Sequence, residues 1–259
     1  TGLDMASYAD AASGVAVSLR NVARQNTGSA GFDTFSGIEN LEGSAFDDVL
    51  SGDGSSNVLI GGGGIDTVDY GRAASGVRVN LAIVGSQNTV GDGIDTLSGI
   101  ENLIGTAFDD ILTGDAGNNR LIGGAGDDIM AVGHGDDVLI GGDGIDTLGY
   151  GGPLASIRIN LNLTTAQDTF GAGLETVSGF ENVIGTNAND ILTGNSGANV
   201  LQGNLGADII DGGMGNDRLD GGGDRDTVSY GQARAGVVVN LGLTTAQDTI
   251  GAGVDVLSG

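Results

Sequence analysis

An apolar residue returns at every ninth position over three long stretches of the chain. It is always the eighth residue of the phrase G-G-x-G-x-D-x-U-x, in which U is apolar. Clear copies begin at Gly61, Gly123, Gly141 and Gly212. A single apolar position in each short segment predicts a short strand that places one side chain in a thin core. The eighth-position residues are Leu50, Leu59, Val68, Leu112, Leu121, Met130, Leu139, Leu148, Leu192, Leu201, Ile210, Leu219 and Val228.

The phrases fall into three blocks that are separated by longer inserts. The blocks are residues 43–69, 105–149 and 185–229, and the inserts are residues 8–42, 70–104, 150–184 and 230–259, the last of them cut short. Every insert opens with a tyrosine, for which we expect a packing role: Tyr8, Tyr70, Tyr150 and Tyr230. An alternating segment follows it, such as GVRVNL from Gly76, which predicts a strand.

The spacing of the repeats indicates how the chain coils. The first block holds three phrases and the other two hold five, a difference of two whole phrases. If successive phrases alternate between two sides of a flattened coil, deleting two phrases preserves the side to which each later residue points. Helical periodicity is absent, so we predict an all-β fold: an elongated right-handed parallel β-roll or β-helix, one continuous solenoid over residues 1–259. Degenerate phrases from Gly28, Val90, Phe170 and Ile250 are expected to continue the solenoid through the inserts with altered turns.

Charge and cysteine content narrow the function. Acidic residues outnumber basic ones 34 to 9, and the net charge is −25. Such a chain repels phosphate backbones and anionic lipid, so we expect neither nucleic-acid binding nor membrane insertion. Cysteine is absent, which leaves bound metal as the alternative staple. The acids recur at fixed places, which favours cation coordination over a metal-free glycine solenoid, where rows of like charge would be costly.

Calcium suits this phrase because it takes six to eight oxygen ligands. Glycines let the backbone adopt φ > 0 and turn carbonyl oxygens toward one point. The turns that we expect to supply carbonyls contain Gly61, Gly62, Gly64, Gly123, Gly124, Gly126, Gly141, Gly142, Gly144, Gly212, Gly213 and Gly215. The sixth position supplies the side-chain oxygens: Asp48, Asn57, Asp66, Asp110, Asn119, Asp128, Asp137, Asp146, Asp190, Asn199, Asp208, Asp217 and Asp226. Corresponding acids in the inserts are Asp33, Asp95, Glu175 and Asp255.

One turn has too few oxygens, so each ion should lie between phrase n and phrase n+2. This pairing predicts shared ions at Asp48 with Asp66, Asp110 with Asp128, Asp128 with Asp146, Asn119 with Asp137, Asp190 with Asp208, Asp208 with Asp226, and Asn199 with Asp217. The phrases that open the blocks depart from the pattern, because Phe46, Phe108 and Ala188 replace the fourth glycine. Ser55, Asp224 and Val132 are further departures. Metal is therefore expected less at Asp48, Asp110 and Asp190 than at Asp66, Asp128, Asp146, Asp208 and Asp217.

These tandem phrases resemble the nonapeptides of repeats-in-toxin (RTX) proteins, which are secreted by bacteria. The resemblance implies a parallel β-roll loaded with several calcium ions. It also implies type I secretion in unfolded form, and folding outside the cell, where calcium is abundant.

Catalytic patterns do not stand out in the sequence. The only histidine, His134, is expected at an exposed turn position in VGHGDD. Neither H-E-x-x-H nor G-x-S-x-G occurs, and strictly periodic acids are unlike a glycosidase pair. We therefore expect no catalytic residue and no enzyme activity in this chain. The Q-[ND]-T segments 87–89, 167–169 and 247–249 suggest polar ladders, without an assignable ligand.

Two functions are compatible with the pattern. The first is a calcium-stiffened structural segment of a secreted bacterial cell-surface or extracellular protein, such as an adhesin, S-layer component or filament, with copies of itself as candidate partners. Both ends lie within repeats, so we expect a longer array. The alternative is a calcium-dependent module of a secreted enzyme or toxin whose catalytic domain lies outside this chain.

Overall fold

The computed structural model describes residues 2–150 and 155–259. The chain divides into two compact units, Thr1–Asp128 and Ile129–Gly259. Thr1 and residues 151–154, near the start of the third insert, lie outside the described residues. That the whole chain is one continuous solenoid stays a prediction.

Short strands make up nearly all of the regular structure. The first unit contains β1 (Met5–Ser7), β2 (Ala16–Ser18), β3 (Gln25–Asn26), the 3-10 turn η1 (Gly28–Ala30), β4 (Phe32–Asp33), β5 (Asn40–Glu42), β6 (Val49–Ser51), β7 (Val58–Ile60), β8 (Thr67–Asp69), β9 (Arg78–Asn80), β10 (Ser86–Asn88), β11 (Ile94–Ser98), β12 (Asn102–Ile104), β13 (Ile111–Thr113) and β14 (Arg120–Ala125). The second contains β15 (Ile129–Ala131), β16 (Val138–Asp143), β17 (Thr147–Gly149), β18 (Arg158–Asn160), β19 (Gln167–Asp168), β20 (Leu174–Ser178), β21 (Asn182–Ile184), β22 (Ile191–Thr193), β23 (Val200–Gln202), β24 (Ile209–Asp211), β25 (Arg218–Asp220), β26 (Thr227–Val228), β27 (Gln247–Asp248) and β28 (Val254–Ser258). The all-β prediction is confirmed, and no described residue lies in a helix long and apolar enough to cross a membrane.

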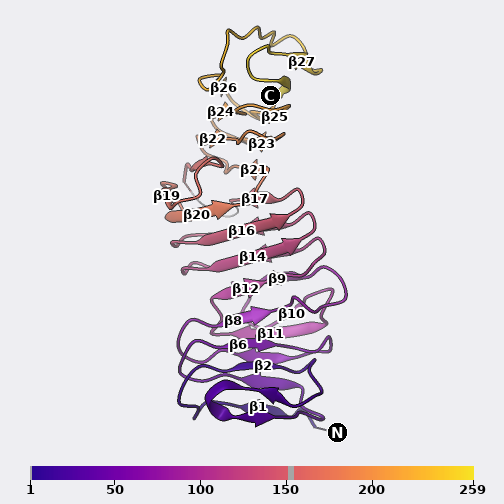
Figure 1. The fold of residues 1–259 in the computed structure, drawn as a ribbon. Coiled ribbons are helices and arrows are strands. Elements are labelled where there is room, and N and C mark those ends of the chain that lie inside the picture. Colours follow the sequence, from indigo (N-terminus) through magenta and orange to yellow (C-terminus); the bar gives the residue numbers. More distant parts are fainter. Residues whose placement is uncertain (1, 151–154) are drawn as a thin grey trace. The chain divides into compact units, whose positions relative to one another are not determined.

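Strands two phrases apart pair in parallel, as the repeat arithmetic predicted. In the first unit β6 pairs with β8, which places Leu50 beside Val68. In the second unit β22 pairs with β24 and β24 with β26, so Leu192, Ile210 and Val228 stand in one column. Within the first unit, strands β2, β6, β8 and β12 lie one above another (Figure 1). Each coil therefore consists of two phrases.

The eighth-position residues form the core. All of them are buried except Val228, which is half-buried. Leu50, Leu59 and Leu121 are completely inaccessible to solvent. The residues on either side of each point outward, because side chains alternate along a strand.

The inserts continue the stack, as predicted. In the second insert, β9 pairs in parallel with β13, and β12 pairs in parallel with both β8 and β14. Leu103 therefore stands between Val68 and Leu121, in register with the nonapeptide columns. An unforeseen feature accompanies these strands: each insert also forms an antiparallel hairpin, β3–β4, β10–β11, β19–β20 or β27–β28.

The Q-[ND]-T segments form one arm of each hairpin, so the suggested polar ladder is replaced by local bonds. In the second insert, Gln87 accepts a hydrogen bond from the Asn80 N–H (2.8 Å) and donates one to the Asn80 carbonyl (3.1 Å). Asn88 accepts from the N–H of Val90, a non-glycine residue at φ 62°. Thr89 donates to the Gly93 carbonyl and to Asp95. The three polar residues thus close the altered turn.

Candidate metal centre

The sixth-position side chains stack from coil to coil. The backbone N–H of Asp48 donates to Oδ1 of Asp66, and the N–H of Asp190 donates to Oδ1 of Asp208, both at 2.8 Å. Predicted partners are also adjacent at Asp110 with Asp128 (2.8 Å), Asp208 with Asp226 (3.0 Å) and Asn199 with Asp217 (3.0 Å). Asp128 with Asp146 and Asn119 with Asp137 span the two units, and these pairs stay predictions.

The second oxygen of several of these carboxylates is buried without a hydrogen-bond partner. This holds for Oδ2 of Asp66, Asp208 and Asp226. A methyl carbon added to Gly203 would lie 2.1 Å from Oδ2 of Asp208 and 2.7 Å from the carbonyl oxygen of Gly221. The bare Cα of Gly203 therefore leaves a space where a carboxylate oxygen and a carbonyl oxygen of the next coil converge. We call such a space, between a sixth-position carboxylate and a backbone carbonyl of the next coil, a cation cradle. A hard cation that binds oxygen, such as calcium, fits this arrangement.

No group of three or more His, Cys, Asp or Glu side chains that could hold a metal occurs among the described residues. A cation at Asp208 would therefore depend on one or two carboxylates supplemented by backbone carbonyls. Glycine makes those carbonyls available. Gly62 and Gly64 have φ of 111° and 110°, and a methyl carbon on Gly62 would lie 2.0 Å from the carbonyl oxygen of Ser44 in the adjacent coil.

The carboxylates of the block-opening phrases, by contrast, are fully hydrogen-bonded. Asp110 accepts bonds from the Val77 N–H (2.6 Å), the Thr106 N–H (2.5 Å) and the Thr106 hydroxyl (3.0 Å). Asp48 and Asp190 have equivalent partners in Ser44 and Thr186. A hydroxyl residue thus replaces the second glycine and closes the turn itself, and metal binding at these three acids stays a prediction.

The asparagines of the second phrases also have hydrogen-bond partners. Asn57 accepts a bond from the Asp53 N–H (3.0 Å) and donates to the carbonyl of Glu39 (2.7 Å). Asn119 and Asn199 make the equivalent bonds. Each accepts a bond from an N–H within its own turn and donates one to a carbonyl of the preceding coil. Their amides join coils without a metal, and their predicted role as ligands is untested.

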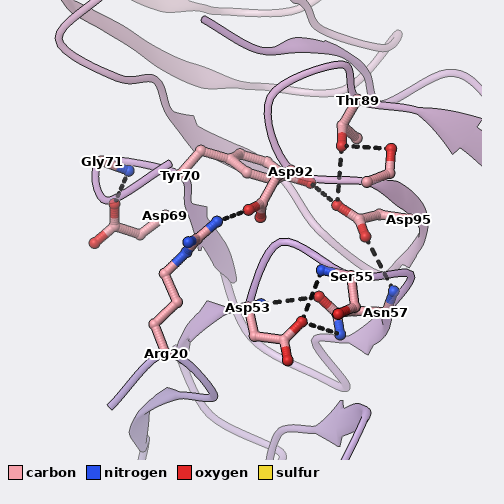
Figure 2. Close-up of polar contacts among 11 residues, drawn as sticks. Arg20, Asp53, Ser55, Asn57, Asp69, Tyr70, Gly71, Thr89, Asp92 and Asp95 are labelled. Atoms are coloured by element: carbon pink, nitrogen blue, oxygen red, sulfur yellow. Dashed lines mark hydrogen bonds and ion pairs between the residues drawn. The ribbon is translucent and has the colours of Figure 1, made fainter. Parts of the chain in front are cut away.

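In the first two inserts, the acid is bound by the tyrosine that opens the insert. The Tyr8 hydroxyl donates to Asp33 (2.8 Å) and the Tyr70 hydroxyl to Asp95 (3.2 Å). Asp95 also accepts bonds from Thr89 and from the N–H of Asn57 (Figure 2). In the third insert Glu175 accepts from Thr169, and its Oε1 is buried without a hydrogen-bond partner, so this acid retains an oxygen for a cation. Asp255 accepts bonds from Thr249 and from the N–H of Asp217.

The tyrosine–acid contact has a signal in the spacing of the sequence. Each acid follows its tyrosine at one constant interval, as in 33 − 8 and 95 − 70. The expected packing role of the tyrosines is confirmed for Tyr8, Tyr70 and Tyr150, which are buried, whereas Tyr230 is half-buried. The hydroxyls of Tyr8 and Tyr70 have a second role, because each donates a hydrogen bond to the insert acid, whereas those of Tyr150 and Tyr230 are buried without a hydrogen-bond partner.

Three glutamates absent from our predicted ligands also belong to the acid stack. Glu101 accepts a bond from the Asp66 N–H (2.8 Å), and Glu181 accepts one from the Asp146 N–H (2.9 Å). Glu39 does the same for the N–H of Asp4. Each occupies the place of the next sixth-position acid, at the insert tail S-G-[IF]-E-N. Each glutamate follows its partner aspartate at the same interval, as in 101 − 66 and 181 − 146, and this interval identifies the glutamate in the sequence.

His134 is exposed, as expected, and its Nδ1 lies 3.0 Å from the carbonyl oxygen of Gly171.

Burial raises the pKa of the stacked acids. Desolvation is the largest cause for Asp66 and Asp208, whose pKa is raised to about 6, and neighbouring carboxylates add to it. The pKa of Asp95 and of Asp217 is also raised to about 6, and that of Glu175 to about 7. Each of these groups is costly to ionise in the metal-free fold, which a bound divalent cation would reverse.

These raised pKa values predict how the chelated chain responds to pH. A carboxyl group whose pKa is higher in the folded than in the unfolded state favours folding when protonated, and this gain is lost as pH rises through the folded value. The calcium-free chain should therefore gain β-structure on acidification from about pH 7 to about pH 4. Circular dichroism in chelator at a series of pH values would measure the gain. Loss of β-structure over that interval would contradict the assigned pKa directions.

A methyl group should disturb the cation cradle at Gly61. Its carbon would lie 1.9 Å from the Gly99 carbonyl oxygen and 2.4 Å from Oδ2 of Asp66. We expect Gly61→Ala to destabilise the calcium-loaded chain by about 1–3 kcal/mol, as overpacking does. Denaturant unfolding at fixed calcium would measure this. Gly236→Ala is the control, because nothing lies within 4 Å of its added carbon; equal losses in the two variants would refute the close approach.

Comparison with known protein families agrees with this chemistry. The model of the RTX calcium-binding nonapeptide repeat (4 copies) matches residues 33–68, 95–130, 113–148, 176–210, 184–219, 193–228 and 215–232. Together these ranges cover more than half of the chain. The chain therefore belongs to the RTX calcium-binding repeat family. It is a calcium-binding module, and its repeats are typical of proteins exported by type I secretion.

Proposed function

We propose that the chain is a calcium-stiffened structural segment of a secreted bacterial cell-surface or extracellular protein, such as an adhesin, S-layer component or filament. The observation that carries the proposal is the register of the inserts. Leu103 of the second insert stands between Val68 and Leu121, and Val183 of the third stands between Leu148 and Leu201. Blocks of different length are therefore joined without interrupting the core column, as an extendable structural element requires.

Calcium would stiffen the segment by joining successive coils. At Asp208 the converging oxygens come from two coils, since Gly221 lies two phrases after Gly203. A cation bound by both would resist their separation, and it would neutralise carboxylates that otherwise repel one another. Stiffness would then depend on calcium at every coil that has such a cradle.

Single-molecule stretching of the whole chain tests this function. In millimolar calcium we expect resistance to force, followed by release of about 900 Å of chain for 259 residues. In chelator the chain should extend smoothly at low force. A chain that takes up calcium yet extends at the same low force in both conditions would overturn the structural role, and it would favour a calcium-dependent module of a secreted enzyme or toxin. Electron microscopy after calcium addition would test assembly of copies into sheets or fibres.

A further inference from the structure

One turn of the first unit contains a cation supplied by the chain itself. Arg20, which follows β2, forms an ion pair with Asp92 of the second insert, and Figure 2 shows its guanidinium directed at that carboxylate. The Asp92 side chain is only 2% exposed and that of Arg20 is 21% exposed. A carboxylate buried to this degree requires a compensating charge.

This ion pair lies between two stacked turns, residues 52–57 and 90–95. The N–H of Asn57 donates to Asp95 (3.0 Å), and β7 pairs in parallel with β11 directly after these turns. A methyl carbon added to Gly54 would lie 3.2 Å from Nη2 of Arg20 and 3.6 Å from Oδ1 of Asp92. The guanidinium therefore lies against a glycine turn, between successive coils. In other coils this type of position is where calcium is expected.

Both partners are peculiar to this place in the chain. The second insert has Asp92 at a fixed interval after its tyrosine (92 − 70), and at the same interval the other inserts have Ala30, Ala172 and Ala252. Arg20 likewise stands at a fixed interval after Tyr8 (20 − 8), where the other inserts have Ala82, Asn162 and Gly242. An extra acid thus occurs in one insert, and an extra base in another insert reaches it.

The sixth position of the lower turn carries no charge. This residue is Asn57, whose amide donates to the Glu39 carbonyl and to Asp53 (3.3 Å). Asp53 in turn accepts a bond from the Ser55 N–H (2.8 Å), which keeps it within its own turn. Asp92 is accordingly the buried carboxylate that faces the guanidinium, and Arg20 is the charge that balances it.

We propose that Arg20 replaces calcium at this pair of turns. The guanidinium neutralises Asp92 and joins turns 52–57 and 90–95 without a metal, whereas coils with a cradle like that of Asp208 require calcium. This inference rests on the proposed calcium-dependent function. Its consequence is that this junction adds no calcium ion to those that the folded chain binds.

Removing the guanidinium should convert the junction into a calcium site. We expect Arg20→Ala to bind one calcium ion more per chain than the wild type in equilibrium dialysis against radioactive calcium. The double variant Arg20→Ala/Asp92→Ala should return to the wild-type number. Arg24→Ala is the matched control, because it removes the same charge from the same insert, where the Arg24 guanidinium lies 4.5 Å from the centroid of the exposed Phe32 ring.

A folded Arg20→Ala chain that binds the wild-type number of ions would overturn the inference. If that variant does not fold, a crystal structure of the wild-type chain in calcium decides. Arg20 on Asp92 with no ion between the turns supports the inference, and an ion on Asp92 with Arg20 displaced overturns it. Failure of the wild type to bind any calcium would instead overturn the proposed function, so the two failures are distinguishable.

Discussion

Chelation of calcium is expected to abolish the β-structure of the chain, and addition of millimolar calcium to restore it. The fold stacks buried carboxylates from coil to coil, and Oδ2 of Asp66, Asp208 and Asp226 has no hydrogen-bond partner within the protein. Without a cation, these ionised groups are desolvated and repel one another at neutral pH. The core cannot offset this cost easily, because each short strand contributes at most one buried apolar side chain.

Far-ultraviolet circular dichroism during titration with calcium would measure the transition. Magnesium at equal concentration is the control for ionic strength, because it prefers six ligands in strict octahedral geometry and retains its water. We expect magnesium to restore little β-structure. A spectrum unchanged by chelator would contradict a calcium-dependent fold.

The regular part of this fold follows from the sequence because one rule repeats. An apolar eighth position alternating between two sides of a coil specifies the strands, their parallel partners and the core. Leu50 beside Val68 and Leu192 beside Ile210 are the register that a coil of two phrases requires. Glycine positions were equally informative, since the second and fourth glycines adopt the positive φ that the turn needs.

Hairpins and acid partners were harder to predict because they depend on contacts between dissimilar segments. The bond from Tyr70 to Asp95 joins residues whose spacing is constant but whose types give no periodic signal. Glu101 stands in line with the aspartates only because the insert returns the chain to the same column. The full hydrogen bonding of Asp110 depends on Val77 N–H and the Thr106 hydroxyl, which the nonapeptide phrase does not contain. Tertiary placement therefore decides which of the periodic acids retain a free oxygen.

The difference between the two kinds of acid leads to a test at Asp208 and Asp190. Asp208 is in the middle of a column, since its Oδ1 accepts from the Asp190 N–H and its own N–H donates to Asp226. Asp208→Asn keeps an oxygen for the first bond but removes the charge and the buried second oxygen. We expect it to lose about 2.7 kcal/mol of stability for each calcium site lost, at free calcium about 100 times the Kd.

Asp190→Asn should behave differently, although the same charge is removed. Both oxygens of Asp190 accept bonds, from the Ile157 N–H, the Thr186 N–H and the Thr186 hydroxyl, and an amide nitrogen cannot accept them. This variant should lose stability by about 1–3 kcal/mol at every calcium concentration at which the chain folds.

Denaturant unfolding at a series of calcium concentrations separates the two effects. The dependence of stability on calcium should become shallower in Asp208→Asn and stay as in the wild type in Asp190→Asn, because the first change removes bound ions and the second removes only hydrogen bonds. If the dependence of stability on calcium becomes equally shallow in both variants, the block-opening acids bind calcium despite their hydrogen bonds. The distinction between turns that calcium joins, such as that of Asp208, and turns that a hydroxyl residue closes, such as that of Asp190, would then be wrong.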